Sequence, residues 1–203
     1  MMLTALILSD SRFPGGGHVH SGGLEEAAAR GLVVDEPSLK SFLHGRLLTA
    51  GLLSAGFAAA AARGEDLEML DAELDARTPS PAQREASRAQ GRGMLRAARR
   101  AWPSARLDAL SASPHQPLVI GVLVDDPYEA ALTCAYLSVS GPASAAVRLL
   151  GLDPFGVNAI VASLGVEEVA ARACKELPAL GSPALDLLAE AHVRREGVRL
   201  FGS

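Results

Sequence analysis

The sequence predicts an all-α protein, on three observations. Hydrophobic residues make up 49% of the 203 residues and aromatic residues only 4%, so alanine, leucine and valine must form the core. Alanine and leucine favour helices, whereas a sheet would be richer in aromatic residues and threonine. Five prolines each follow a polar residue, as at helix N-termini: Glu36-Pro37, Ser80-Pro81, Asp126-Pro127, Asp153-Pro154 and Ser182-Pro183. We expect one domain over residues 1–203, a helical bundle of roughly eight to ten helices.

In the first half of the chain, a short lead over residues 1–20 precedes the helices. Hydrophobic residues at helical spacing, ended by glycine or proline, predict the helices that follow. They cover residues 37–63, 67–76 and 81–101, with a further short helix around Leu107.

In the second half, residues 118–124 are rich in β-branched side chains and would suit a buried strand. No neighbouring segment supplies a partner strand, so we expect a buried helix instead. Later helices are expected over residues 127–140, 143–150, 154–174 and 183–193, with an interruption at Gly141-Pro142. Residues 194–203 follow as a tail.

Charge and composition exclude several classes of function. The net charge of −4 argues against general nucleic-acid binding. The uncharged run at 47–62 is shorter than the ~20 residues that a membrane span needs, and residues 1–8 lack the basic residues of a signal peptide. Cys134 and Cys174 have no metal-ligand spacing and fit two reduced thiols. We expect a cytoplasmic protein that meets neither membrane nor nucleic acid.

The most unusual stretch is residues 9–26, which contains five glycines, one proline and two of the five histidines. Glycines at this density indicate a particular backbone path, because they permit positive φ and close approach. Ser21 is placed to cap a helix that begins at Gly22 or Gly23, with Glu25 near its positive end. The stretch therefore predicts a tight turn that leads into a helix.

The residue types of this stretch raise two kinds of site, a metal site and a phosphate-binding loop. His18 and His20, with Glu25, offer the ligand types of a zinc or nickel site. In the alternative, one histidine binds a buried backbone group and the other lies at the surface. A phosphate-binding loop is improbable, because no lysine follows the glycines until Lys40. Since no nucleophile–base pair stands out either, we expect no catalytic residues, no bound metal and no cofactor.

Two further segments predict protein contacts. Arginines recur every fourth residue from Arg84 to Arg100 and form a basic stripe on the predicted helix, which is either a solvated face or a docking surface for an acidic partner. The tail ends with Arg199, Leu200 and Phe201, an arginine and two apolar residues where most chains fray. This composition favours docking.

Five blocks in order resemble the UreF family of urease accessory proteins. The first block comprises Asp10-Ser11, Pro14-Gly15-Gly16 and residues 20–25. The others are Arg84-Glu85-Ala86-Ser87 with Gly91, His115-Gln116-Pro117 through Gly121, Val147-Arg148-Leu149-Leu150-Gly151, and Arg199-Leu200-Phe201-Gly202-Ser203. The chain departs from the family pattern at residues 153–156, where Gly-Gln is common, and at His18, near a position that is often aromatic.

The resemblance implies a non-enzymatic, homodimeric assembly factor. Such proteins join the accessory protein UreD, called UreH in some organisms, and the GTPase UreG, and they help deliver nickel to apo-urease. The residues expected to bind partners are Pro14, Gly15, Gly16, His20, Ser21, Gly23, Leu24, Glu25, Arg84, Ser87, Arg88, His115, Arg199, Leu200 and Phe201. Two alternatives stay open: a metal-dependent enzyme that uses His18, His20 and Glu25, and a generic helical adaptor that binds through the basic stripe.

Overall fold

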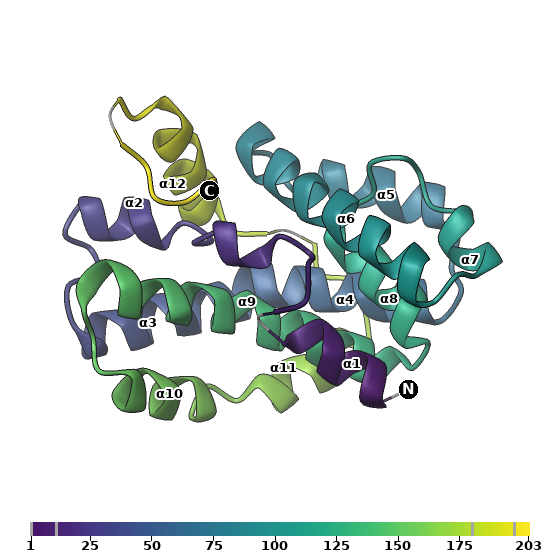
Figure 1. Ribbon diagram of the computed structural model, residues 1–203, viewed down its shortest axis with the longest axis horizontal. Helices are drawn as coiled ribbons and strands as arrows, with labels where there is room; N and C mark the ends of the chain where they lie inside the picture. The colour runs from purple at the N-terminus through teal and green to yellow at the C-terminus, as the bar shows by residue number, and fades with distance from the viewer. Residues whose placement is uncertain (1, 11, 180, 197) are drawn as a thin grey trace.

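The computed structural model describes all residues except 1, 11, 180 and 197, and the described part contains helices and no strand (Figure 1). The all-α prediction is confirmed. The α-helices are α1 (Met2–Ser9), α2 (Leu24–Ala29), α3 (Glu36–Arg46), α4 (Leu52–Ala62), α5 (Leu67–Ala76), α6 (Pro81–Ala101), α7 (Ala105–Asp108), α8 (Gln116–Val124), α9 (Pro127–Leu150), α10 (Pro154–Ala162), α11 (Val166–Ala173) and α12 (Pro183–Arg194). A 3-10 turn, η1 (Gly17–Val19), precedes α2, and a π-helical turn, η2 (Leu47–Gly51), joins α3 to α4.

The core forms where α4 packs against α8 and α9, in the middle of the molecule in Figure 1. The alanines of α4 are buried, and their small side chains let the neighbouring helices approach closely. Helix α8 approaches α4 closely at Gly121. A Cβ there would lie 2.7 Å from the Cβ of Ala61, and closer still to the carbonyl oxygen of Ala58.

The predicted helix starts are confirmed at four of the five proline sites. Ser80, Asp126, Asp153 and Ser182 each accept a hydrogen bond from a backbone N–H in the first turn. At the fifth site the helix begins one residue earlier, because Asp35 is the cap and Glu36 lies inside α3.

The expected break at Gly141-Pro142 is wrong, since α9 runs without interruption from Pro127 to Leu150. Proline has no N–H, so the carbonyl of Ser138, four residues earlier, loses its helical donor. The Nε of Arg46 donates to this carbonyl at 2.7 Å from the end of α3. A side chain distant in sequence thus replaces the missing bond and lets the helix continue.

The expectation of one helix over residues 154–174 is also wrong. The chain forms α10 and α11 instead, separated at residues 163–165. Gly165 adopts a positive φ of 68° as the N-cap of α11, a conformation that ends a right-handed helix and that glycine adopts without strain. Both helices pack on α9, but α10 also contacts α3 and α11 also contacts α4.

Within the part of the chain that the structure describes, two helical runs are long and apolar enough to cross a membrane, Glu36–Ala62 and Pro127–Leu150. Most of each apolar window, 67% and 61% respectively, is buried inside the fold. This burial is consistent with the core helices of a soluble protein.

Candidate functional site

The glycine-rich segment at residues 9–26, called the opening stretch below, runs between α6 and α9 on a path that depends on glycine. At the Pro14-Gly15-Gly16 turn, a Cβ on Gly93 of α6 would lie 2.9 Å from the carbonyl oxygen of Gly15. Gly16 itself has a φ of 79°. The turn therefore lies directly on α6 because no side chain separates the two backbones.

A second pair of glycines turns the chain into α2. Gly22 and Gly23 have positive φ of 63° and 89°, and Gly23 is the N-cap. The predicted start at Gly22 or Gly23 is corrected to Leu24. Ser21 is not the cap residue, although its Oγ accepts the N–H of Glu25 at 3.2 Å. Its own hydroxyl donates to the carbonyl oxygen of Ser203 at 2.7 Å.

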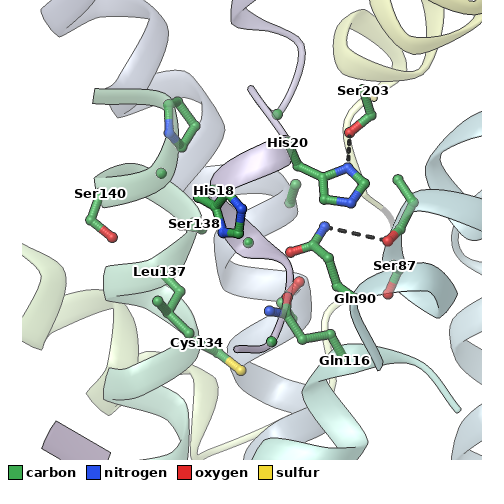
Figure 2. Close-up of a pocket in the computed structure, with 18 of the residues that line it drawn as sticks. His18, His20, Ser87, Gln90, Gln116, Cys134, Leu137, Ser138, Ser140 and Ser203 are labelled. Atoms are coloured by element: carbon green, nitrogen blue, oxygen red, sulfur yellow. Dashed lines mark hydrogen bonds between the residues drawn. The ribbon is translucent and has the colours of Figure 1, made fainter. Parts of the chain in front are cut away.

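The tail folds back onto this same stretch. The N–H of Gly202 donates to the carbonyl of Val19 at 2.7 Å, and the N–H of Ser21 donates to the carbonyl of Ser203 at 2.6 Å. His20 Nδ1 and Ser203 Oγ are hydrogen-bonded at 2.7 Å (Figure 2). The opening stretch and the tail, which the sequence treats as separate docking segments, thus form one surface.

Glu25 anchors the tail. Its carboxylate accepts the N–H groups of Leu200 and Phe201, both at 3.0 Å, and a guanidinium N–H of Arg195 at 2.7 Å. Burial opposes ionisation of this carboxyl, but these donors and nearby His192 together hold the pKa of Glu25 below its usual value. Glu25 is therefore an internal anchor at neutral pH.

A cavity of about 650 Å³ lies beneath the opening stretch, between it and α6, α8 and α9. His18, His20, Gln90, Gln116 and Cys134 are among its lining residues, and Figure 2 shows these side chains around it. Burial, and secondarily the charge of His18, lower the pKa of His20, so its ring is neutral at neutral pH. Burial raises the pKa of the Cys134 thiol, which is consequently unreactive.

The structure does not bring together the three residues of the hypothetical metal-dependent enzyme. His18 and His20 line the cavity, whereas both oxygens of Glu25 bind the tail. Among the described residues, the metal-binding side chains that gather are those of Asp71, Asp75 and His115. A guanidinium nitrogen of Arg88 lies 2.8 Å from an oxygen of each of these carboxylates. This group is therefore an ion-pair network that already contains its own cation.

His115 and Ser87 join this network in an arrangement that sequence reasoning missed. The Nε2–H of His115 donates to Asp75 at 2.9 Å, which leaves Nδ1 to accept the hydroxyl of Ser87 at 2.9 Å. The residue types are those of a hydrolase triad, but Ser87 lies inside α6. Backbone N–H groups there are bonded along the helix, so none is left to form an oxyanion hole beside it. His115 is 1% exposed and ties α6 to α5.

The arginines of the basic stripe fall into two groups, those that bind groups of this chain and those that are exposed without a carboxylate partner. Its N-terminal half is occupied internally, since Arg88 binds Asp71 and Asp75 and a guanidinium nitrogen of Arg84 donates to two carbonyls before α6. Arg92 pairs with Glu85 at 2.7 Å. Within the described residues, Arg96 and Arg100 have no carboxylate at ion-pair distance, and both are exposed.

The fifteen residues predicted to bind partners differ in how accessible they are. Those at least partly exposed are Pro14, Gly16, His20, Arg84, Ser87, Arg88, Arg199 and Leu200. Those buried are Gly15, Ser21, Gly23, Leu24, Glu25, His115 and Phe201. Phe201 is 6% exposed and has the guanidinium of Arg148 at 4.6 Å from its ring centroid, while neighbouring Leu200 is 68% exposed. Partner binding by these residues stays a prediction.

Comparisons with known proteins identify the family. The UreF family model matches residues 33–165. The chain is 50% identical to the "Urease accessory protein UreF" of Mycolicibacterium vanbaalenii, over 96% of both chains. It is 46% identical to proteins of the same name from Mycobacterium sp. strain JLS, over 96% of both chains, and from Mycobacterium tuberculosis, over 94% of this chain and 93% of the relative. The chain therefore belongs to the UreF family.

Proposed function

We propose that this protein is a urease accessory factor that binds UreD (UreH) and the GTPase UreG and helps deliver nickel to apo-urease in the cytoplasm. The observation that carries the proposal is similarity to urease accessory proteins along nearly the whole chain. Its role is non-catalytic, because the Ser87–His115–Asp75 arrangement lacks an oxyanion hole and Glu25 is withdrawn from His18 and His20. Nickel is the cargo of this process, and UreG is the partner that hydrolyses GTP.

The joined surface of the opening stretch and the tail is the docking face that we assign to UreD. Its internal bonds hold the tail backbone through Glu25 and Ser21, while Leu200 projects outward with 68% of its surface exposed. An exposed leucine on a backbone that is already fixed loses little entropy on binding. The tail therefore acts as a preformed ligand rather than as a loose arm.

Co-purification of tail variants with UreD and UreG tests this assignment. Leu200→Ala is expected to reduce the UreD recovered with the protein by at least threefold without changing thermal stability. Leu32→Ala removes a comparably exposed leucine, 61% exposed, on the segment before α3 and serves as the matched control. Equal recovery of UreD with both variants would remove the tail from the interface.

Complementation tests the function itself. In a host with its own UreF gene deleted, expression of this chain with its cognate urease genes is expected to restore urease activity and the nickel content of purified urease. Urease that stays free of nickel, despite a folded chain and intact UreD and UreG, would contradict the proposal. Light scattering of the purified protein tests the proposed homodimer independently, since a monomeric mass would exclude it.

The histidines of the opening stretch are not expected to hold nickel tightly. The ring of His20 is already bonded through Nδ1 to Ser203, and among the described residues His18 belongs to no group of three or more metal-binding side chains. Replacing both by alanine should therefore leave the nickel affinity of the isolated protein low and little changed. Loss of tight nickel binding in calorimetry would restore the metal-site interpretation.

A further inference from the structure

Arg46 carries a charge that no carboxylate balances. Its side chain lines the cavity, and its Nε and Nη1 donate to the carbonyls of Ser138 and Gly22, both at 2.7 Å. Among the described residues no acidic group lies at ion-pair distance from it, and Nη2 has no hydrogen-bond acceptor. Burial lowers the pKa of Arg46 to about 10. Carbonyls satisfy N–H donors but leave the charge uncompensated, and even partial burial of such a cation without a counter-charge is costly.

The cavity wall contains a second positive charge. Arg148 contributes a second guanidinium, whose contacts are the carbonyl of His18 at 3.3 Å and the ring of Phe201. Asp10 has the one acidic side chain among the described lining residues, and Arg12 pairs with its carboxylate at 2.6 Å. Neutral donors complete the wall, namely the hydroxyls of serines and the amides of glutamines, some of which Figure 2 shows.

We propose that this cavity binds a small oxyanion, with Arg46 as the principal ligand. The free Nη2 and the second N–H of Nη1 present two donors in one plane, which is the geometry that an oxyanion accepts. Serine hydroxyls and glutamine amides on the wall supply further donors, and Arg148 adds long-range attraction. The volume of about 650 Å³ admits such an ion together with its water shell. The site concerns a free ligand and does not depend on the proposed role in urease maturation.

A structural role for Arg46 alone makes a different prediction. If Arg46 serves only to replace the helical donor that Pro142 lacks, its charge has no ligand, and added anions will not bind at its guanidinium. If the oxyanion site exists, binding will require the guanidinium itself. The two can therefore be separated by titration with an anion.

The experiment is calorimetric titration of the full-length protein with inorganic phosphate at constant ionic strength. The wild type is expected to bind one phosphate per chain, and Arg46→Gln to weaken that binding at least tenfold. Arg46→Lys keeps the positive charge but loses the planar pair of guanidinium donors, so its phosphate affinity should lie between those of the wild type and Arg46→Gln. Arg96→Gln, an exposed arginine outside the cavity, is the control and should bind as the wild type does.

Crystals soaked in selenate locate the site directly through the anomalous signal of selenium. Selenate beside Arg46 would support the proposal. Selenate only at surface arginines, or phosphate affinity unchanged in Arg46→Gln, would overturn it. Should Arg46→Gln fail to fold, Arg148→Gln leaves both carbonyl bonds of Arg46 intact and should weaken phosphate binding severalfold. No loss in that variant, together with no selenate in the cavity of the wild type, would also overturn the proposal.

Discussion

The bond between Arg46 and Ser138 yields a quantitative test of how α9 passes through Pro142. Two substitutions, Arg46→Met and Pro142→Ala, and their combination form a double-mutant cycle. In the wild type, Arg46→Met removes donors from two carbonyls, those of Ser138 and Gly22. Hydrogen bonds from a charged donor are worth about 1.5–3 kcal/mol each when buried. Because the side chain is half-buried and cavity water can replace it in part, we expect a cost of about 2 kcal/mol in the free energy of unfolding.

The same substitution should cost less in the Pro142→Ala background. Alanine at position 142 has an N–H that donates to the Ser138 carbonyl within the helix, so Arg46 is then needed only at Gly22. We expect the cost of Arg46→Met to fall to about 1 kcal/mol, which corresponds to a coupling energy of about 1 kcal/mol.

Urea unfolding followed by far-ultraviolet circular dichroism measures all four free energies. Arg96→Met, on the exposed face of α6, provides the control and should combine additively with Pro142→Ala, within about 0.5 kcal/mol. If Arg46→Met costs the same with proline and with alanine at position 142, Arg46 does not supply the missing donor, and the explanation of the continuous helix is wrong.

Three other predictions follow from packing and titration. Gly121→Ala should destabilise the protein by about 1–3 kcal/mol, because the added methyl group overlaps α4. The control is Gly141→Ala, whose methyl group meets no atom within 4 Å and which should be neutral or stabilising. Thermal unfolding compares the two variants. Burial, with a smaller contribution from the charge of Arg88, lowers the pKa of His115, so the unfolded chain binds a proton more readily than the folded one. Stability should therefore fall as pH drops below 6.5, and denaturant midpoints of a His115→Gln variant should show a shallower fall. The pKa of Glu25 is lowered, so its contribution is complete at neutral pH and is lost as pH falls from about 4.5 through the folded value. Glu25→Gln should accordingly speed hydrogen exchange at the two tail amides that it accepts, and unchanged exchange would show that the tail is held elsewhere.

Helices were predictable from the sequence where their causes are local. Capping by Ser80, Asp126 and Ser182 involves side chains and N–H groups three residues apart, so short stretches contain the whole signal. The alanine-rich composition likewise indicates close helix packing, which α4 and its neighbours confirm.

One of the two errors in the helix predictions arises where a distant group decides. Proline in a helix is ordinarily a break, and only Arg46, 92 residues from Ser138, makes α9 continuous. Nothing at residues 141–142 reveals that donor. The split between α10 and α11 had a local signal, Gly165, but one glycine does not by itself separate a break from a tolerated interior position.

The candidate site divides in the same way. Its glycines, its histidines and the arginine-rich helix are visible in the sequence, because residue types and their spacing are local properties. Their partners are not, since which carboxylate a side chain meets depends on helices that pack together only in the folded chain. Tertiary structure alone places Glu25 on the tail, Arg88 between Asp71 and Asp75, and Arg46 in a cavity where no described carboxylate lies at ion-pair distance from it. Sequence thus determined the locally capped helices and the family resemblance, and long-range packing determined which polar groups are used internally and which remain for a ligand or partner.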